Sequence, residues 1–378
     1  MSDLESLLSR LVSIDSVNPS LVPGARGESE IGAFVAEWLR GKGLDVQRQE
    51  TGSPGRENVI AVARGTGGGR SLLLNAHMDT VGVSGMSAPF QPVTTDGKLF
   101  GRGAMDTKGA LAAFMSAAAE AHTMGLRGDV ILTAVVDEEY ASIGTEAVAR
   151  SWKPDAAIVG EPSGLQIVTE HKGFVWFRIE TAGVAAHGSL PDVGVDAILK
   201  MGKVLDALEG LSTRLRQSTP HRTLGAGSLH ASLITGGQEL SSYPASCALD
   251  VERRTIPGES ADSAESEMRH ALEQISKTDP GFKVTLRRTF ERNPMEARRD
   301  SAIVGALAEQ VRRVTGSPAV FSGMSGWLDS ALLDGAGIPT VVLGPAGAGL
   351  HGIEEWVDLK SVRDCRDIAL GTAADFCR

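Results

Sequence analysis

Histidine and acidic residues follow several apolar segments of this sequence, at points where buried strands are expected to end. His77, with Asp79 two residues further on, follows SLLLNA, and the run Asp137, Glu138 and Glu139 follows VILTAVV. Side chains two positions apart on a strand point to the same side, so His77 and Asp79 can share one environment. Whether they form a site depends on similar residues at equivalent places elsewhere.

Three further residues of this kind occupy such places. Glu161 follows the apolar segment AAIVG, Asp106 precedes a long helical pattern, and His351 comes just after TVVLGPAGAGL. Open α/β sheets place their sites in the loops beyond the carboxyl ends of strands. We therefore expect these side chains to converge on one crevice.

Each residue also has an ordinary structural explanation. Asp106 alone is best explained as a helix cap, His77 as a hydrogen-bonded core histidine, and Glu161, which precedes a proline, as a turn residue. The acidic run 137–139 could form a solvated loop. Their joint occurrence at strand ends, with two histidines among them, favours a shared site.

The chemistry of this set is that of a two-metal centre. Imidazole and carboxylate ligands without thiolate suit Zn²⁺, Mn²⁺ or Co²⁺, and two such ions lower the pKa of a bound water to about 7. Adjacent carboxylates in the acidic run can then supply one ligand and one proton acceptor, while Asp79 orients His77. Other hydrolase signatures are missing, since there is no H-E-x-x-H and GMSGW around Ser325 breaks the G-x-S-x-G pattern.

Apolar periodicity predicts the elements that position these residues. The first half alternates short apolar runs with helical patterns, which is typical of an α/β domain. Residues 58–77 predict two strands around a glycine-rich turn, because GTGGGR lacks the ending of a phosphate loop. The segment after Asp106 predicts a long helix with that aspartate as N-cap. Other predicted elements are strands at 129–136, 155–160 and 338–344 and helices at 4–12, 301–314 and 359–376.

The middle of the chain has a different pattern, strand-helix-strand-strand-helix-strand, which is that of a ferredoxin-like α+β domain. Because the α/β pattern resumes afterwards, we predict a domain 174–290 inserted into a catalytic α/β domain 1–173 and 291–378. The six predicted elements are 174–183, 195–211, 230–237, 246–254, 263–275 and 282–290.

Composition limits the class of partner. The chain has 378 residues, room for two domains, with 37 Lys and Arg against 47 Asp and Glu. The net charge of −10 argues against nucleic acid, whose phosphates need a basic face. Three widely spaced cysteines fit reduced thiols in a cytoplasmic protein. No apolar run approaches the ~18 residues of a membrane span, so no membrane partner is expected.

Six segments, taken together, resemble the di-zinc aminoacylase and carboxypeptidase family, which includes acetylornithine deacetylase, succinyl-diaminopimelate desuccinylase and glutamate carboxypeptidase. They occur in the family's order and span nearly the whole chain. They are LLLNAHMDTV, GRGAMDTKGALAAFM, VVDEEYASIGTEA, VGEPSG, AAHGSLPDVGVDAI and GLHGIEEWVDL.

The resemblance implies a role for each metal-site residue. His77 and Glu161 would hold one zinc, Glu139 and His351 the other, and Asp106 would bridge the two. Glu138 would be the general base and later the proton donor to the leaving amine. Thr107 and the Gly-Ala after Lys108 depart from the family's usual residues beside the bridging aspartate, without removing a ligand.

The resemblance also assigns the inserted domain as a lid and dimerisation domain of the zinc-hydrolase fold. His187 in AAHGSLP would reach into the partner subunit's site and stabilise the oxyanion, although a turn histidine is the ordinary alternative. Arg254 would grip the substrate carboxylate, or be an exposed strand residue. Ser241 stands where the family commonly has asparagine, which puts one substrate contact in doubt.

We therefore expect a cytoplasmic, homodimeric hydrolase with two zinc ions, or cobalt or manganese, that cleaves the amide bond of a small N-acyl amino acid. A carboxypeptidase or dipeptidase is the alternative within the family, since it cleaves the same bond type. A metal-binding protein without turnover is the alternative from another class.

Overall fold

The computed structural model describes residues 3–378, which fold into two compact units. Unit 1 consists of the chain up to Thr169 together with Ala297–Ser322 and Leu328–Arg378, and unit 2 consists of Glu170–Glu296 and Gly323–Trp327. Unit 2 is therefore inserted in the sequence of unit 1. The predicted fold class, an α/β domain with an inserted ferredoxin-like α+β domain, is confirmed.

Unit 2 differs from the predicted inserted domain, residues 174–290, at both ends and by one additional segment. Residues 323–327, which the sequence analysis placed in the first domain, group with unit 2. The Trp327 ring lies 6.1 Å from the Phe174 ring, and its indole N–H donates to the Asn293 carbonyl at 3.0 Å. The assignment of catalysis to one domain and of a lid to the other stays a prediction.

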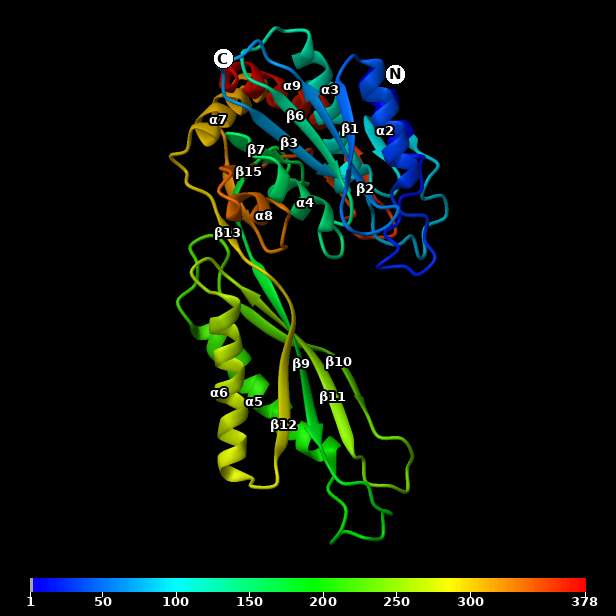
Figure 1. Ribbon diagram of the computed structural model, residues 1–378, viewed down its shortest axis with the longest axis vertical. Coiled ribbons are helices and arrows are strands. Elements are labelled where there is room, and N and C mark those ends of the chain that lie inside the picture. The colour runs from blue at the N-terminus through cyan, green and yellow to red at the C-terminus, as the bar shows by residue number, and fades with distance from the viewer. Residues whose placement is uncertain (1–2) are drawn as a thin grey trace. The chain divides into compact units, whose positions relative to one another are not determined.

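A mixed sheet forms the centre of unit 1 (Figure 1), with strands in the order β1-β2-β6-β3-β7-β15-β8. β3 pairs in parallel with β6 and β7, and β15 pairs in parallel with β7. β14, Phe321–Met324, also pairs with β8. The other bounds are β1 Asp45–Glu50, β2 Glu57–Ala63, β3 Leu72–His77, β6 Val130–Val135, β7 Ala156–Val159, β8 Ile167–His171 and β15 Thr340–Val342.

Side chains on both faces of the central strands are buried, which explains their continuous apolar runs. On one face, Leu72, Leu74 and Leu132 pack in a core shared with α1, α2, α3, α7 and α9. On the other face lie Asn75 and Thr133, and the Asn75 amide donates to α4. The helices are α1 Asp3–Val12, α2 Ser29–Gly41, α3 Gly109–His122, α4 Ile143–Ser151, α7 Ala302–Thr315, α8 Ser330–Gly335 and α9 Leu359–Phe376.

A small second sheet in unit 1 brings together two segments that are far apart in sequence. Its order is β16-β17-β5-β4, all antiparallel, with Val357 opposite Leu99. The sheet thereby joins the chain that leads to Asp106 with the chain around His351. The bounds are β4 Val93–Thr95, β5 Lys98–Phe100, β16 Gly347–Ala348 and β17 Trp356–Asp358.

The prediction that Asp106 caps the following helix is wrong. Asp106 and Thr107 have non-helical backbone angles, with φ −117° and −131°, and α3 begins only at Gly109. The Asp106 carboxylate faces two histidines rather than helix N–H groups. An irregular turn over Ala104–Lys108 therefore leads into α3.

Unit 2 is a four-stranded antiparallel sheet with α5 and α6 on one face (Figure 1), in the order β10-β11-β9-β12. Alternate residues of β9, such as Phe177 and Ile179, are buried against Met201 of α5 and Met268 of α6. The bounds are β9 Gly173–Ala182, α5 Ala197–Gln217, β10 Ser228–Gly236, β11 Ser246–Thr255, α6 Ala261–Thr278 and β12 Lys283–Arg292. The short strand β13, Met295–Glu296, lies outside this sheet and pairs antiparallel with β8.

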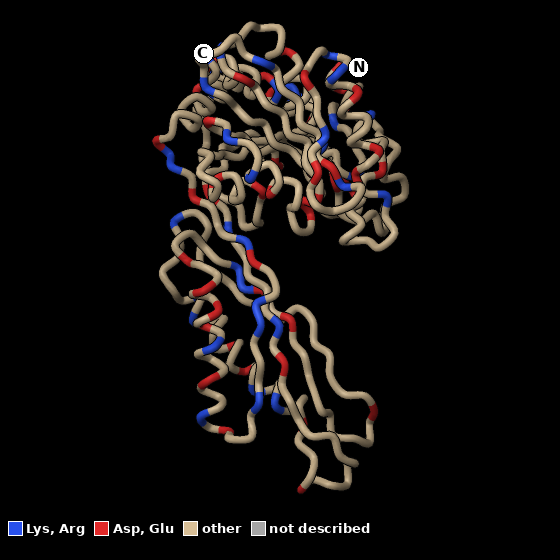
Figure 2. The backbone as a smooth tube through the Cα atoms, in the orientation of Figure 1, with Lys and Arg blue, Asp and Glu red and all other residues tan. Residues whose placement is uncertain are grey.

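Lys and Arg are interspersed with Asp and Glu in both units (Figure 2). On the sheet of unit 2, for example, Arg178 pairs with Asp250 at 3.0 Å and Arg288 pairs with Glu291 at 2.7 Å. Among residues 3–378, no helix has the length and apolar character needed to cross a membrane. The three cysteines are all buried and unpaired by disulfides.

Candidate metal centre

Three strands of unit 1 deliver the predicted ligands to one edge of the sheet. His77 is the last residue of β3 and lies opposite Val135, the last residue of the parallel strand β6. The acidic run begins two residues after Val135. β7 ends at Val159, and the Gly160 N–H donates to the Asn75 carbonyl of β3, which places Glu161 at the same edge.

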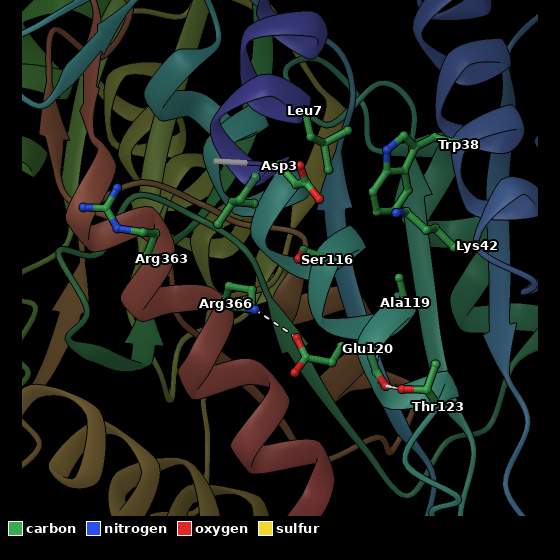
Figure 3. A pocket seen from close by; sticks show the side chains of 11 residues that line it. Asp3, Leu7, Trp38, Lys42, Ser116, Ala119, Glu120, Thr123, Arg363 and Arg366 are labelled. Carbon is green, nitrogen blue, oxygen red and sulfur yellow. Dashed lines mark hydrogen bonds and ion pairs between the residues drawn. The ribbon is translucent and has the colours of Figure 1, made fainter. Parts of the chain in front are cut away.

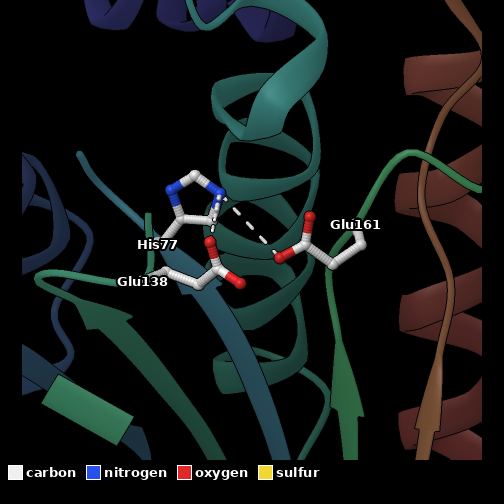
Figure 4. A group of neighbouring side chains, drawn as sticks. All are labelled: His77, Glu138 and Glu161. Carbon is white, nitrogen blue, oxygen red and sulfur yellow. Dashed lines mark ion pairs between the residues drawn. The ribbon is translucent and has the colours of Figure 1, made fainter. Parts of the chain in front are cut away.

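His77 lies at the centre of the resulting cluster. Its Nε2 atom lies 3.1 Å from Asp106 Oδ1, 3.8 Å from Glu161 Oε1 and 4.0 Å from Glu138 Oε2. Figure 4 shows His77, Glu138 and Glu161 pointing toward one another. The candidate ligand atoms of these three residues all lie within 4.8 Å of one another, as do those of His77, Asp106 and Glu139.

His351 approaches the cluster from the other side of Asp106. Its Nε2 atom lies 3.2 Å from Asp106 Oδ2 and 3.3 Å from Glu139 Oε2. Asp106 therefore presents one oxygen to each imidazole, His77 on one side and His351 on the other. This is the arrangement that a carboxylate bridging two cations requires.

Asp79 holds the backbone of the acidic run. Its Oδ1 accepts from the Glu138 N–H at 3.1 Å, and its Oδ2 accepts from the Glu139 N–H at 3.2 Å. His77 Nδ1 is closer to the Asp79 carbonyl, at 2.9 Å, than to the Asp79 carboxylate, at 3.6 Å. Asp79 thus orients His77 mainly through its main chain and positions two neighbouring acids through its side chain.

A network of buried polar side chains holds Asp79 in place by hydrogen bonds. Asn18 donates to Asp79 at 2.8 Å and to Asp137 at 3.1 Å. Arg56 contacts Asp137 at 2.6 Å and Glu28 at 3.0 Å, and the Glu28 carboxylate accepts from the Asp137 N–H. The sequence analysis missed Asn18, Glu28 and Arg56, because no local pattern links residues so far apart to the acidic run.

The carboxylates of the cluster repel one another. Burial, reinforced by the charge of Glu161, raises the pKa of Glu138 well above its usual range, and burial also raises that of Glu161. Burial and the charge of Asp106 raise the pKa of Glu139 to about 7. Without a cation, burial and mutual repulsion therefore favour the protonated forms of these carboxyl groups.

The neighbouring carboxylates raise the pKa values of both histidines. Hydrogen bonds with Asp106 and Glu139 raise the pKa of His351 to about 10. Burial alone would lower the pKa of His77, but its contacts with Asp106 and Asp79 outweigh burial and raise that pKa. Burial would raise the pKa of Asp106, but the two histidines keep it below its usual range.

The donor set fits a pair of divalent cations. It combines two imidazoles with several carboxylates and no thiolate, which suits Zn²⁺, Mn²⁺ or Co²⁺. Within residues 3–378, the buried Glu139 Oε1 has no hydrogen-bond partner. A buried carboxylate oxygen without a donor is costly, and a cation at the cluster would satisfy it.

Asp329 is a further buried acid that the sequence analysis missed. Its Oδ2 accepts from Thr145 Oγ1 at 2.5 Å, whereas its Oδ1 has no partner among the described residues. Burial raises the pKa of Asp329 to about 6, and its charge in turn raises those of Glu138 and Glu161. In sequence, Asp329 looks like the N-cap of α8, but it makes no capping bond.

His187 and Arg254 belong to unit 2 rather than to the cluster. His187 is exposed, and its Nδ1 lies 2.7 Å from Ser189 Oγ. Arg254 Nε contacts Glu252 at 2.6 Å, and its guanidinium lies 5.3 Å from the centre of the Phe174 ring. The predicted roles of both residues toward substrate stay predictions.

A surface cavity of about 450 Å³ lies among α1, α2, α3 and α9 (Figure 3), and none of its lining residues belongs to the cluster. Three of its charged lining groups are paired, since Arg366 pairs with Glu120 at 2.9 Å and Arg363 pairs with Glu5 at 2.7 Å. Among residues 3–378, its lining residues form none of the groups of histidine and acidic side chains that could hold a metal ion.

A family model and a related protein each match most of this chain. The model of peptidase family M20/M25/M40 matches residues 73–375. An acetylornithine deacetylase of Myxococcus xanthus is 30% identical over 390 residues, which cover 99% of this chain and 97% of that protein.

Solved structures share the fold. A tripeptidase of Staphylococcus aureus superposes with a TM-score of 0.79 at 21% identity, covering 99% of this chain and 98% of that one. An M20 family metallo-carboxypeptidase of Sulfolobus solfataricus has a TM-score of 0.79 at 16% identity, covering 99% of each chain. A dinuclear metal binding peptidase of Bacillus subtilis has a TM-score of 0.77 at 16% identity, covering 99% and 97%.

Proposed function

The chain belongs to peptidase family M20/M25/M40 and is a metal-dependent hydrolase, and we propose that it removes the acyl group from a small N-acyl amino acid. The observation that carries the proposed two-metal chemistry is Asp106, whose two oxygens face different histidines at 3.1 and 3.2 Å. The 30% identity to an acetylornithine deacetylase over the full chain favours deacylation.

The proposed metal ligands are those that the family resemblance implies. His77 and Glu161 would hold one ion, Glu139 and His351 the other, and Asp106 both. Two zinc ions, with cobalt or manganese as alternatives, would supply polarisation of the amide carbonyl and acidification of water. The unpartnered oxygen of Glu139 and the gathering of the candidate ligand atoms around His77 support this proposal.

Glu138 is the proposed proton-transfer group, the role that the family resemblance implies. Its side chain points into the same space as His77 and Glu161, and the Asp79 carboxylate fixes its backbone. In this role Glu138 accepts a proton from the attacking water and returns it to the departing amine. Asp79 fixes the backbone positions of Glu138 and Glu139. In this arrangement one acid transfers protons while its neighbour binds metal.

The proposed roles of unit 2 are closure over the substrate and dimerisation. Strand β10 is an edge strand whose Leu233 and Ile234 are 68% and 54% exposed, and an exposed apolar edge favours pairing with another chain. A second copy of this chain is the proposed partner. His187 would then serve the partner's site, and Arg254 would bind the substrate carboxylate.

Free-amine release from N-acetyl, N-succinyl and dipeptide substrates, with zinc and after chelation, tests the proposal. Chelator-sensitive release of acetate or succinate is the expected result. Preferential cleavage of dipeptides would instead favour a peptidase, which is the activity for which several structural neighbours are named. If zinc is bound and no member of the panel is cleaved, the alternative of a metal-binding protein without turnover gains support.

Mixed dimers test the role of His187. When His187→Ala and Glu138→Ala chains are combined, each mixed dimer would contain one site with both residues intact if His187 acts in the partner's site. Regained activity in verified mixed dimers is expected. Its absence would contradict the role of His187 across the interface. The cytoplasmic location is also part of the proposal, and the three reduced, buried cysteines support it.

A further inference from the structure

One ion pair in unit 1 is almost completely buried. Arg102 and Glu355 are 2% and 1% exposed, and Arg102 Nη1 lies 2.7 Å from Glu355 Oε2. Removing two charges from water costs several kcal/mol per ion, and well-packed apolar residues often serve stability equally well. The pair therefore needs an explanation other than stability alone.

Glu355 accepts hydrogen bonds from the backbone that carries the bridging aspartate. Its Oε1 accepts from the N–H groups of Met105 and Asp106 at 2.9 and 3.0 Å. Its Oε2 accepts from the Gly103 N–H at 2.9 Å as well as from Arg102. One carboxylate thus binds three backbone donors of a single turn.

The turn bonds the Lys108 N–H to its own Gly103 carbonyl, but the N–H groups of Gly103, Met105 and Asp106 donate to Glu355 instead. Asp106 has φ −117° and ψ 92°, and Gly103 has the positive φ of 79°, so the segment is not a regular helix. Buried N–H groups without an acceptor are costly. The Glu355 carboxylate is therefore what holds the turn in the conformation that presents the Asp106 side chain.

Arg102 connects the same turn to two other loops. Its Nε donates to the Gly82 carbonyl at 3.2 Å, in the loop that follows His77 and Asp79. Its Nη2 donates to the Gly352 carbonyl at 2.8 Å, next to His351. The planar guanidinium reaches three directions at once, which a lysine could not do.

We propose that Arg102 and Glu355 form a clasp, the Arg102–Glu355 clasp, that fixes the relative positions of His77, Asp106 and His351 before any cation binds. Both are positioning residues, because they contact the ligand-bearing loops and none of the ligand side chains. This inference rests on the proposed metal chemistry and deepens it.

The consequence for metal binding follows from the geometry. A bridging carboxylate must present two oxygens to two cations at once, and metal sites tolerate displacements of only about 0.5 Å. Loss of outer contacts to metal ligands typically reduces metal affinity about 10- to 100-fold. A broken clasp should therefore weaken the binding of both ions that share Asp106.

The test uses the full-length chain with zinc as the probe, and Glu355→Gln as the main variant. The amide keeps one acceptor oxygen but turns an NH₂ group toward donors, so part of the clasp is lost. Glu354→Gln is the matched control, because it removes the same charge from the exposed neighbouring residue. Arg102→Lys is a milder second variant, which keeps the charge and loses the contacts with Gly82 and Gly352.

Zinc affinity is measured by competition with a chromogenic chelator, and backbone protection of the metal-free protein is measured by hydrogen exchange. We expect Glu355→Gln to lower zinc affinity at least 10-fold and to speed exchange in the peptide that contains residues 103–106. We expect Arg102→Lys to speed exchange around residues 78–82 and 349–355. Glu354→Gln should change neither quantity.

A purely structural role predicts a different result. Ile368→Ala, a cavity variant in the middle of α9, lowers stability without touching the three loops. If Glu355→Gln and Arg102→Lys lose thermal stability like Ile368→Ala but bind zinc within two-fold of the parent protein, the clasp is refuted. If the parent protein binds neither zinc nor cobalt nor manganese, the two-metal proposal is overturned, and the clasp with it.

Discussion

Replacement of Arg56 tests whether the network beneath the acidic run is a structural necessity. Arg56 is buried between Glu28 and Asp137, whose side chains are only 1% and 2% exposed. Arg56→Met preserves an extended side chain but leaves both carboxylates without their cation. Removing one partner of a buried ion pair typically costs about 3–5 kcal/mol, because the remaining charge is uncompensated. We expect a loss of this size in the free energy of unfolding at pH 7.5.

The loss of unfolding free energy should become smaller as the pH falls. Burial already raises the pKa of Glu28, and removal of Arg56 raises it further. A carboxyl group whose pKa is higher in the folded state contributes stability below its unfolded pKa, and this contribution is lost as pH rises through the folded pKa. For one proton, the change is about 1.4 kcal/mol per pH unit. The deficit of Arg56→Met should therefore shrink between pH 7.5 and pH 5.5.

The assay is urea unfolding of the metal-free protein, followed by circular dichroism at the two pH values. Arg64→Met is the matched control, because Arg64 also contacts two acids, Asp45 and Asp129, but its side chain is 58% exposed. Exposed ion pairs contribute at most about 1 kcal/mol. A deficit for Arg56→Met no larger than that of the control, or one that is equal at both pH values, would refute the argument.

Four further changes test the site and the proposed interface. Glu138→Gln should lower kcat by about 10²- to 10⁴-fold, as expected for loss of a general base, while zinc content measured by atomic absorption stays unchanged. Glu139→Gln should lose one of the two zinc ions in the same measurement. Thr145→Val removes the hydrogen bond from Thr145 Oγ1 to Asp329 Oδ2 and should lower the unfolding free energy by about 1–3 kcal/mol, whereas Thr145→Ser should not. Leu233→Glu on strand β10 should shift sedimentation from dimer to monomer, with unfolding of unit 1 unaltered.

The sequence predicted the strands β2, β3, β6, β7 and β15 and most of the cluster around His77, but it did not predict α2, α4, α8, β1, β4, β5 or β8. Continuous apolar runs indicate strands buried on both faces, and the carboxyl ends of parallel strands meet at one edge. His77, Glu138 and Glu161 each follow such a run, so their convergence could be expected without coordinates. The order of strands and helices in unit 2 was equally visible, because each element buries one periodic apolar face.

Tertiary structure decided what local patterns could not show. Asp106 has the sequence context of a helix cap, but contacts with His77 and His351 from distant loops hold it in a non-helical turn. Asp329 likewise resembles a cap and is instead a buried acid near the cluster.

The support of the metal centre is also a tertiary property. Arg102 and Glu355 are 253 positions apart, and Arg56 and Asp137 are 81 positions apart. In a sequence, each of these residues is an ordinary charged residue that would be expected at the surface. Only the packed chain buries them against one another, because a charge can remain inside a protein only where folding brings its partner to it. Residue types and spacing therefore determined which chemistry is available, and the long-range contacts decided how its groups are held.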